Sequence, residues 1–99
     1  MKFLVLWTLA VERPTAEMFN VVARQPDYAR RLAADGKLAA RYHLVGKHGG
    51  AWIYDVDSNE ELERLLAMAP VYNFSRYDIY PLAEMEGAEY ILQPPQTRS

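Results

Sequence analysis

Residues 38–69, LAARYHLVGKHGGAWIYDVDSNEELERLLAMA, decide the fold, because they predict two strands and a helix in immediate succession. The segments 38–45 and 51–56 are rich in apolar, aromatic and β-branched residues. Five residues, 46–50, separate them, and three of these are glycine. This pattern is typical of a β-hairpin with a five-residue loop.

The helix that follows the hairpin carries its own start signal. Ser58 is followed three residues later by Glu61, the spacing of a capping box. Apolar residues then recur at i, i+3, i+4 and i+7, namely Leu62, Leu65, Leu66 and Ala69, before Pro70 ends the helix. We expect the three leucines to point into the core between this helix and the sheet.

A strand and a longer helix precede the hairpin. Residues 3–9 are almost entirely apolar, which predicts a central, buried strand. Thr15 is suited to cap a helix that ends at Asp35, with Gly36 as the left-handed residue after it. Apolar residues recur at helical spacing along it, namely Phe19, Val22, Pro26, Ala29 and Ala33. Pro26 predicts a kink, or two helical pieces that meet near Gln25.

The chain closes with a strand over residues 74–82, and Pro81 near its end predicts either an edge strand or a strand terminus. The order β-α-β-β-α-β predicts a ferredoxin-like α+β domain over residues 1–85, with a four-stranded antiparallel sheet and both helices on one face. Nothing in the domain covers the other face, so we expect a homodimer or larger homo-oligomer. The tail, residues 86–99, is expected to be partly disordered or docked on a neighbouring subunit.

Composition removes several classes of function. The 99 residues carry a formal net charge of −2 and no cysteine, which argues against nucleic-acid binding and a disulfide scaffold. The two histidines do not have metal-ligand spacing, and the glycines do not form a phosphate loop. We therefore expect no metal and no cofactor. No segment is long enough to span a membrane, so a cytoplasmic location is expected.

Several short motifs together resemble the muconolactone isomerase family over about residues 1–85. They are Asp35-Gly36, Gly46, Tyr54-Asp55-Val56-Asp57-Ser58, Leu65-Leu66, Ala69-Pro70 and Tyr77-Asp78-Ile79. The resemblance implies a dimeric α/β barrel that moves a proton within an unsaturated five-membered lactone, in bacterial aromatic catabolism, without a cofactor. Leu4 and Leu6 stand where this family is expected to have polar or basic side chains, which indicates a divergent member.

Arg41 and His43 are the first candidates for chemistry. They lie two residues apart on one strand and so share a face of the sheet. A histidine can accept a proton and return it elsewhere, and an arginine can bind a carboxylate in bidentate fashion. We predict His43 as the proton carrier and Arg41 as the anion-binding residue. The spacing leaves open whether their face looks toward the helices or toward a partner subunit.

The last strand supplies Asp78 as a second candidate for proton transfer and Arg76 as a ligand contact. The alternative for this pair is an ion pair at a subunit contact. Tyr54 is predicted near the ligand, where a tyrosine ring would suit a flat oxygenated compound. His48 either reaches over the pocket mouth or is an ordinary loop histidine.

These residues support more than one function for a small cyclic substrate. Isomerisation by proton transfer is the first interpretation, and related ferredoxin-like dimers also include cofactor-free monooxygenases and polyketide cyclases. A non-catalytic, oligomeric ligand-binding protein is the alternative from another class.

Overall fold

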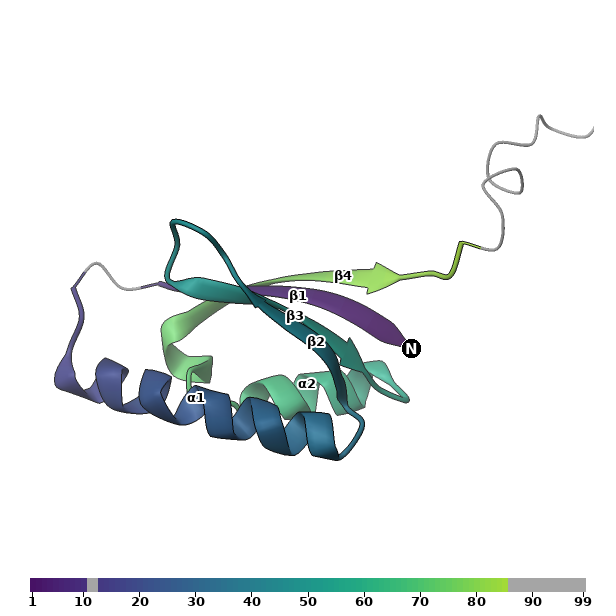
Figure 1. Cartoon of the computed structure of the whole chain (residues 1–99), viewed down its shortest axis with the longest axis horizontal. Helices are drawn as coiled ribbons and strands as arrows, with labels where there is room; N and C mark the ends of the chain where they lie inside the picture. Colours follow the sequence, from purple (N-terminus) through teal and green to yellow (C-terminus); the bar gives the residue numbers. More distant parts are fainter. Residues whose placement is uncertain (11–12, 86–99) are drawn as a thin grey trace, which may run out of the picture.

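The computed structural model describes residues 1–10 and 13–85. In chain order its elements are β1 (Lys2–Leu9), α1 (Ala16–Ala34), β2 (Leu38–His43), β3 (Gly49–Asp55), α2 (Asn59–Ala67), a 3₁₀ turn (Tyr72–Phe74) and β4 (Ser75–Leu82). Figure 1 shows this arrangement. The predicted order β-α-β-β-α-β is confirmed. The predicted tail, residues 86–99, lies outside the described residues.

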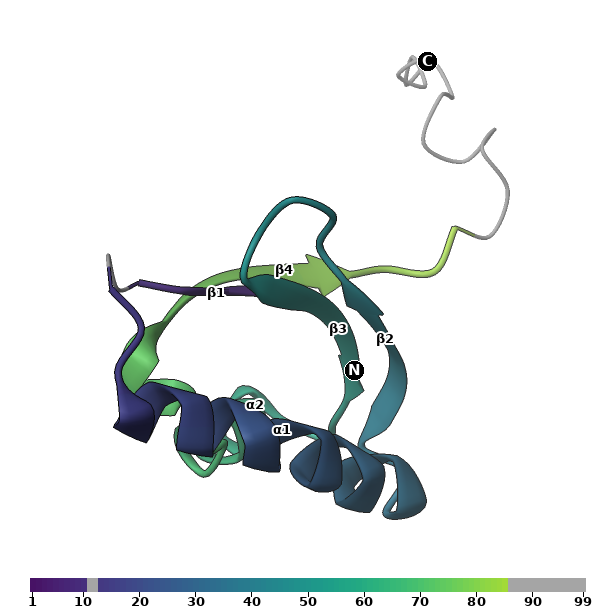
Figure 2. The same cartoon turned by 60° about the vertical axis from the view of Figure 1, so that its left-hand side comes forward.

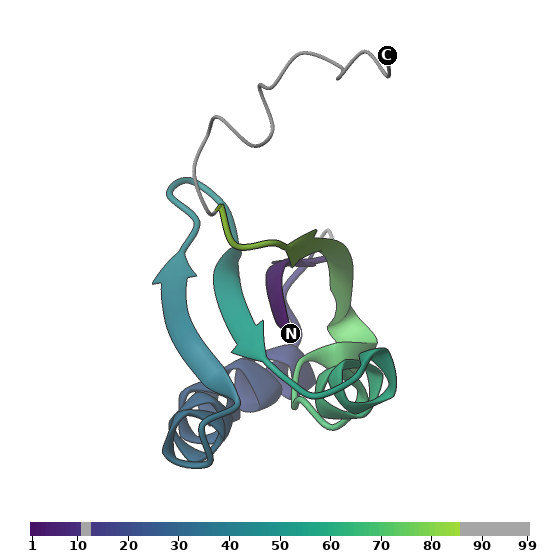
Figure 3. The same ribbon diagram turned by 90° about the vertical axis from the view of Figure 1, so that its right-hand side faces the viewer.

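The four strands form one antiparallel sheet in the order β2-β3-β1-β4. β1 is therefore central, as its apolar run predicted, and β4 is an edge strand, one of the two alternatives that Pro81 indicated. Both helices pack against the same face of the sheet, which Figures 2 and 3 show from two directions.

Strand register divides the side chains between two faces. Phe3, Val5 and Trp7 of β1 lie opposite Tyr54, Trp52 and Gly50 of β3, and the side chains of this set point toward the helices. The helices complete a core made of twelve buried residues: Phe3, Val5, Tyr28, Ala29, Leu32, Leu38, Trp52, Tyr54, Val56, Leu62, Leu66 and Ala69. Alternate residues of every strand point to the other side, which we call the outer face.

The hairpin has a five-residue loop as predicted, but the loop lies two residues earlier, at 44–48. Gly49 and Gly50 belong to β3 rather than to the turn, because they pair directly with Thr8 and Trp7. A Cβ on Gly49 would lie 2.0 Å from the Trp7 carbonyl oxygen. Gly49 therefore permits close approach of two strands, whereas Gly50 leaves space for the indole rings of Trp7 and Trp52.

Helix α1 is one continuous element that contains Pro26, so the prediction of two separate pieces is wrong. Thr15 caps it as expected, since its hydroxyl accepts a hydrogen bond from the Met18 amide at 3.1 Å. Gly36 follows with a φ of 74°, the left-handed region that favours glycine. The buried residues are Met18, Val21, Gln25, Tyr28, Ala29 and Leu32. Phe19 instead is 64% exposed.

Helix α2 begins at the predicted cap. The Ser58 hydroxyl accepts a hydrogen bond from the Glu61 amide at 3.0 Å. Leu62 and Leu66 are buried, whereas Leu65 is only partly buried and packs against the edge of the core. The expected inward face of α2 is thus confirmed for two of the three leucines.

Candidate functional site

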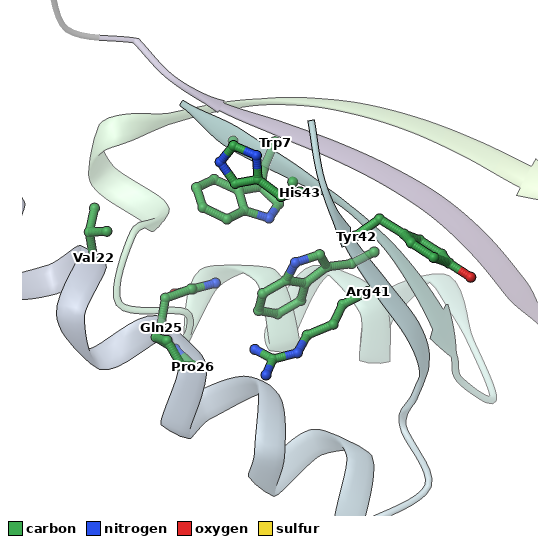
Figure 4. A pocket seen from close by; sticks show the side chains of 10 residues that line it. Trp7, Val22, Gln25, Pro26, Arg41, Tyr42 and His43 are labelled. Carbon is green, nitrogen blue, oxygen red and sulfur yellow. The ribbon is translucent and has the colours of Figure 1, made fainter. Parts of the chain in front are cut away.

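A pocket of about 300 Å³ lies between α1 and the sheet. Its lining comes from four elements: Trp7 of β1; Val22, Gln25 and Pro26 of α1; Arg41, Tyr42 and His43 of β2; and Gly49, Gly50 and Trp52 of β3. Figure 4 shows these side chains, with α1 on one side of the pocket and the strands on the other. A volume of this size falls at the lower end of the range typical of small-molecule sites, roughly 300–1,000 Å³.

Two tryptophans form the aromatic wall of the pocket. The rings of Trp7 and Trp52 pack edge to face, with centroids 6.0 Å apart and an interplanar angle of 89°. They are adjacent because their residues alternate along neighbouring strands, with Gly50 opposite Trp7. Glycine at position 50 leaves the indole rings room to meet above the sheet. The two perpendicular rings provide an apolar aromatic corner against which a planar ring can pack.

The polar groups of the pocket are cationic or neutral. The side chains of Arg41 and His43 are exposed at the β2 side of the pocket, and both project inward in Figure 4. Among residues 1–10 and 13–85, no aspartate or glutamate lines the pocket. Within the described residues, Arg41 forms no ion pair with a carboxylate. No carboxylate of the described residues therefore competes for its guanidinium, which is suited to bind an anionic ligand.

Helix α1 contributes the opposite wall through Gln25 and Pro26. Gln25 is buried, and its Oε1 accepts a hydrogen bond of 3.4 Å from the Val71 amide. This contact ties α1 to the segment between α2 and β4. Pro26 has no amide hydrogen to donate to the carbonyl of Val22, and both residues line the pocket.

The structure decides the question that strand spacing left open for Arg41 and His43. Arg41 pairs with Trp52 and His43 with Gly50, so both side chains belong to the helix-facing side of the sheet. The ring of Tyr42, between them, points away from the pocket. The two residues predicted first are thus brought together in one cavity.

Four other predicted residues do not join them within one chain. Asp78 pairs with Leu6 and Arg76 with Thr8, which places both on the outer face of the sheet. Asp78 therefore cannot reach His43 through the sheet. No Arg76–Asp78 ion pair forms among the described residues. His48 lies exposed in the hairpin loop and does not line the pocket.

Tyr54, expected near the ligand, is a core residue with 1% exposure and is not part of the pocket lining. Burial raises the pKa of its phenol well above the ordinary value. Its ring packs 6.1 Å from Trp52, centroid to centroid, so it supports the aromatic wall from behind. Its hydroxyl is not placed to contact a ligand.

Sequence reasoning did not single out Trp7, Trp52 or Gln25 as pocket residues. A signal for the tryptophans existed, because strand alternation places them on the same face as Arg41 and His43 once the register is known. Gln25 stands at a position of α1 that the apolar spacing skipped. In the described part of the chain, no group of three or more His, Cys, Asp or Glu residues could hold a metal ion. None of the helices described is both long and apolar enough to cross a membrane.

Fold and pocket together define a class: a ferredoxin-like α+β domain with an aromatic-walled pocket between the sheet and α1. The family model described as muconolactone delta-isomerase matches residues 1–87. The chain belongs to this family. It is 33% identical over 73 residues to the muconolactone delta-isomerase of Cupriavidus pinatubonensis, covering 74% of this chain and 79% of the relative. Muconolactone delta-isomerase 1 of Acinetobacter lwoffii is 30% identical over 71 residues, or 72% and 74% of the two chains.

Solved structures show the same fold. A crystal structure of muconolactone isomerase superposes with a TM-score of 0.77 at 23% identity and covers 89% of this chain and 94% of the other. The 5-chloro-2-hydroxyhydroquinone dehydrochlorinase of Burkholderia phenoliruptrix, in complex with 2,5-dihydroxybenzoquinone, superposes with a TM-score of 0.68 at 16% identity, covering 87% and 97%. The expected ferredoxin-like architecture and the family resemblance are confirmed.

Proposed function

We propose that this chain catalyses an intramolecular proton shift on an unsaturated five-membered lactone that carries a carboxylate. The observation that supports the proposal most is the joint projection of Arg41 and His43 into a pocket with an aromatic wall, to whose lining the described residues contribute no carboxylate. Membership of the muconolactone delta-isomerase family supports the reaction class. The cytoplasmic location expected from the sequence is part of the same proposal.

The reaction needs one group that removes a proton and returns it to another carbon. In a lactone whose ring double bond is conjugated with the carbonyl, loss of a proton from the carbon beyond the double bond leaves a dienolate. Return of the proton to the carbon beside the carbonyl moves the double bond. One C–H bond breaks and another forms, with no net change in electrons, so an imidazole that shuttles a proton is sufficient.

His43 takes the role of proton carrier in this proposal, and Arg41 holds the substrate carboxylate. An arginine fork fixes the orientation of a carboxylate through two parallel hydrogen bonds. Because the indole surfaces of Trp7 and Trp52 limit the position of the ring, the ring carbons would be presented to the imidazole in a defined way. In this proposal the proton shift then depends on the position of the lactone ring in the pocket and on His43 as the proton carrier.

Turnover of muconolactone, followed by proton NMR in D₂O, tests this function. The wild-type chain should move the ring double bond without added metal or nucleotide. His43→Ala should lower kcat about a hundredfold or more, as loss of a general base usually does. Arg41→Met should chiefly raise KM, because it removes binding of the carboxylate.

The second histidine provides a matched control. His48 lies outside the pocket, so His48→Ala should retain turnover within about threefold of wild type, since it loses no proton-transfer group. Full turnover by the His43 variant would contradict the assignment of the proton carrier. Saturable binding of muconolactone without any turnover would instead favour the ligand-binding alternative.

We further propose that a second copy of the chain covers the outer face of the sheet. Tyr42, Tyr80 and Leu82 are 65%, 50% and 43% exposed there, and Leu4, Leu6 and Ile53 lie between them. An exposed apolar surface of this kind is typical of an interface. Because the interface is the face without the pocket, assembly would leave the pocket on the opposite, helix-facing side of each sheet.

A further inference from the structure

Gln25 is the one residue with a polar, non-aromatic side chain that is buried among the described residues. It is 5% exposed, and it lines the pocket from α1. Glutamine is mostly exposed in proteins, because burial of its carboxamide is costly unless hydrogen bonds compensate. One such bond is present, since Oε1 of Gln25 accepts from the Val71 amide at 3.4 Å. The nitrogen end of the carboxamide needs an explanation of its own.

The contact with Val71 fixes the direction in which the carboxamide points. An amide nitrogen only donates and cannot accept from a backbone N–H, so the oxygen must face Val71. Nε2 then lies on the other side of the carboxamide. Figure 4 shows this nitrogen projecting from α1 into the space between the helix and the strands. The side-chain N–H groups of Gln25 are therefore directed into the pocket.

Nε2 of Gln25 has no partner and is accessible from the pocket. It donates no hydrogen bond to any described residue. In the described part of the chain, the fully buried side-chain atoms without a partner are Nε1 of Trp7, Oγ of Ser75 and the Tyr77 hydroxyl oxygen. Nε2 is not in this set, so it keeps accessible surface although it has no partner. Because Gln25 lines the pocket, a ligand there can reach Nε2.

We propose that the side-chain amide of Gln25 donates a hydrogen bond to the ring carbonyl oxygen of the substrate. This inference rests on the proposed function and adds the residue that orients the ring. Arg41 on β2 would bind the carboxylate. Gln25, on the opposite wall, would bind the oxygen on which negative charge develops as the proton leaves. A neutral donor directed at such an oxygen stabilises the charged intermediate, as the donors of an oxyanion hole do.

The surroundings of Gln25 suit it to this role. The contact of Oε1 with Val71 and the low exposure of the side chain hold the carboxamide in one orientation, so the donor is in place before a ligand enters. The carboxamide is also uncharged. It supplies a donor without adding an anion that would compete with the substrate carboxylate for Arg41.

A pair of probes tests this donor without any turnover. γ-Butyrolactone has a five-membered ring with the carbonyl but no double bond to shift, whereas tetrahydrofuran has a ring of the same size and no carbonyl. The chain contains three glutamines and three asparagines, so the side-chain amide signals in a ¹H–¹⁵N spectrum are few. Gln25→Met removes one pair of them and thereby assigns the signals of Gln25.

We expect γ-butyrolactone to shift the Gln25 amide signals downfield in a saturable manner, and tetrahydrofuran to leave them nearly in place. Gln25→Met should weaken γ-butyrolactone binding, read from backbone amides of the pocket, about threefold to tenfold, the effect of one lost neutral hydrogen bond. With muconolactone as substrate, this variant should lower kcat about tenfold or more and change KM less, because the donor acts most strongly on the charged intermediate.

Gln25→Glu separates the donor from the contact with Val71. Glutamate keeps an oxygen that can accept from the Val71 amide but has no N–H, so the variant should fold and still lose γ-butyrolactone binding at least as strongly as Gln25→Met. Asn20→Asp is the matched control, because it makes the same change from amide to carboxylate on the same helix. Asn20 is exposed and does not line the pocket, so this variant should bind γ-butyrolactone as wild type does.

Two results would overturn the proposal. The first is a Gln25 amide signal that ignores γ-butyrolactone or shifts equally with both probes, since Nε2 would then serve no ligand carbonyl. The second is wild-type binding of γ-butyrolactone by Gln25→Glu, because the contact with Val71 alone would then account for the residue. Neither probe can be isomerised, so absence of muconolactone turnover would refute the proposed function separately.

Discussion

The two faces of the sheet carry similar residue types and have different chemistry. On the helix-facing side, Arg41 and His43 border a pocket whose wall is formed by two tryptophans. On the outer face, Arg76 lies opposite Thr8 and Asp78 lies opposite Leu6, and the sheet separates both from the helices. Because the spacing along the strand is the same in both pairs, the cavity that Arg41 and His43 border is what distinguishes them from Arg76 and Asp78.

The rows of paired residues across the four strands show which side chains the outer face presents. One row runs Tyr42, Ala51, Leu6 and Asp78, and the next runs Ala40, Ile53, Leu4 and Tyr80. Apolar groups thus occupy the centre of this face, and charges lie toward the β4 edge. Such a surface fits a contact between subunits better than it fits a proton-transfer site.

The helix-facing side should be the more sensitive of the two to loss of an apolar side chain. Leu66→Ala should cost about 2–5 kcal/mol of unfolding free energy, because Leu66 is 5% exposed and its removal leaves a cavity. Met68→Ala, at a residue 63% exposed, should change stability by less than about 0.5 kcal/mol. Urea unfolding measures both. Equal effects would show that the core has been placed wrongly.

Substitutions on the outer face should instead change self-association of the chain. Leu6→Lys places a charge at the centre of the proposed contact and should weaken self-association about a hundredfold or more, because a buried unpaired charge is costly. Light scattering across a concentration series measures the change, with Met68→Lys as the surface control. A wild-type chain that is a folded monomer at micromolar concentration would remove the proposed interface altogether.

Asp78 distinguishes the two faces most directly in an activity measurement. Because it lies across the sheet from His43, Asp78→Asn should alter kcat for muconolactone by less than about threefold, well below the effect expected for loss of a general base. Steady-state kinetics above the assembly concentration provides the comparison. A loss as large as that of His43→Ala would mean that Asp78 enters the reaction through the assembled oligomer.

The smallest expected effect is on the pH dependence of stability. It concerns Glu61, Lys37 and Asp57, a charged cluster that belongs to neither face of the sheet. The pKa of Glu61 is lowered because its carboxylate accepts a hydrogen bond from the Asp57 amide and another from Lys37. A lowered folded-state pKa stabilises the fold above the ordinary value of 4.5, and this contribution disappears as the pH falls through the folded-state pKa. Glu61→Gln should therefore show a slightly smaller fall in Tm than wild type between about pH 6 and about pH 3. An identical fall in both proteins would contradict this contribution.

Local sequence signals were sufficient to predict the helices and strands and their order along the chain. Thr15 and Ser58 mark helix starts through caps that depend only on neighbouring residues, and Gly36 marks a helix end. The hairpin loop was displaced in the prediction because Gly49 and Gly50 resemble turn residues. The constraint on Gly49 is the backbone of β1, 41 positions away in the sequence, and the constraint on Gly50 is the indole rings of Trp7 and Trp52.

The sequence by itself determined that Arg41 and His43 share a face, because side chains alternate along a strand whatever surrounds it. It also determined the antiparallel α+β class, through the order of apolar periods. Only the tertiary structure decided which face looks toward the helices, since that depends on register with β3 and on where α1 packs. The same register separated Asp78 from His43, buried Tyr54, and brought the nitrogens of Trp7 and Trp52 together above Gly50. These are contacts between distant segments, and hydrophobic burial against the helices selects them from the pairings that local periodicity allows.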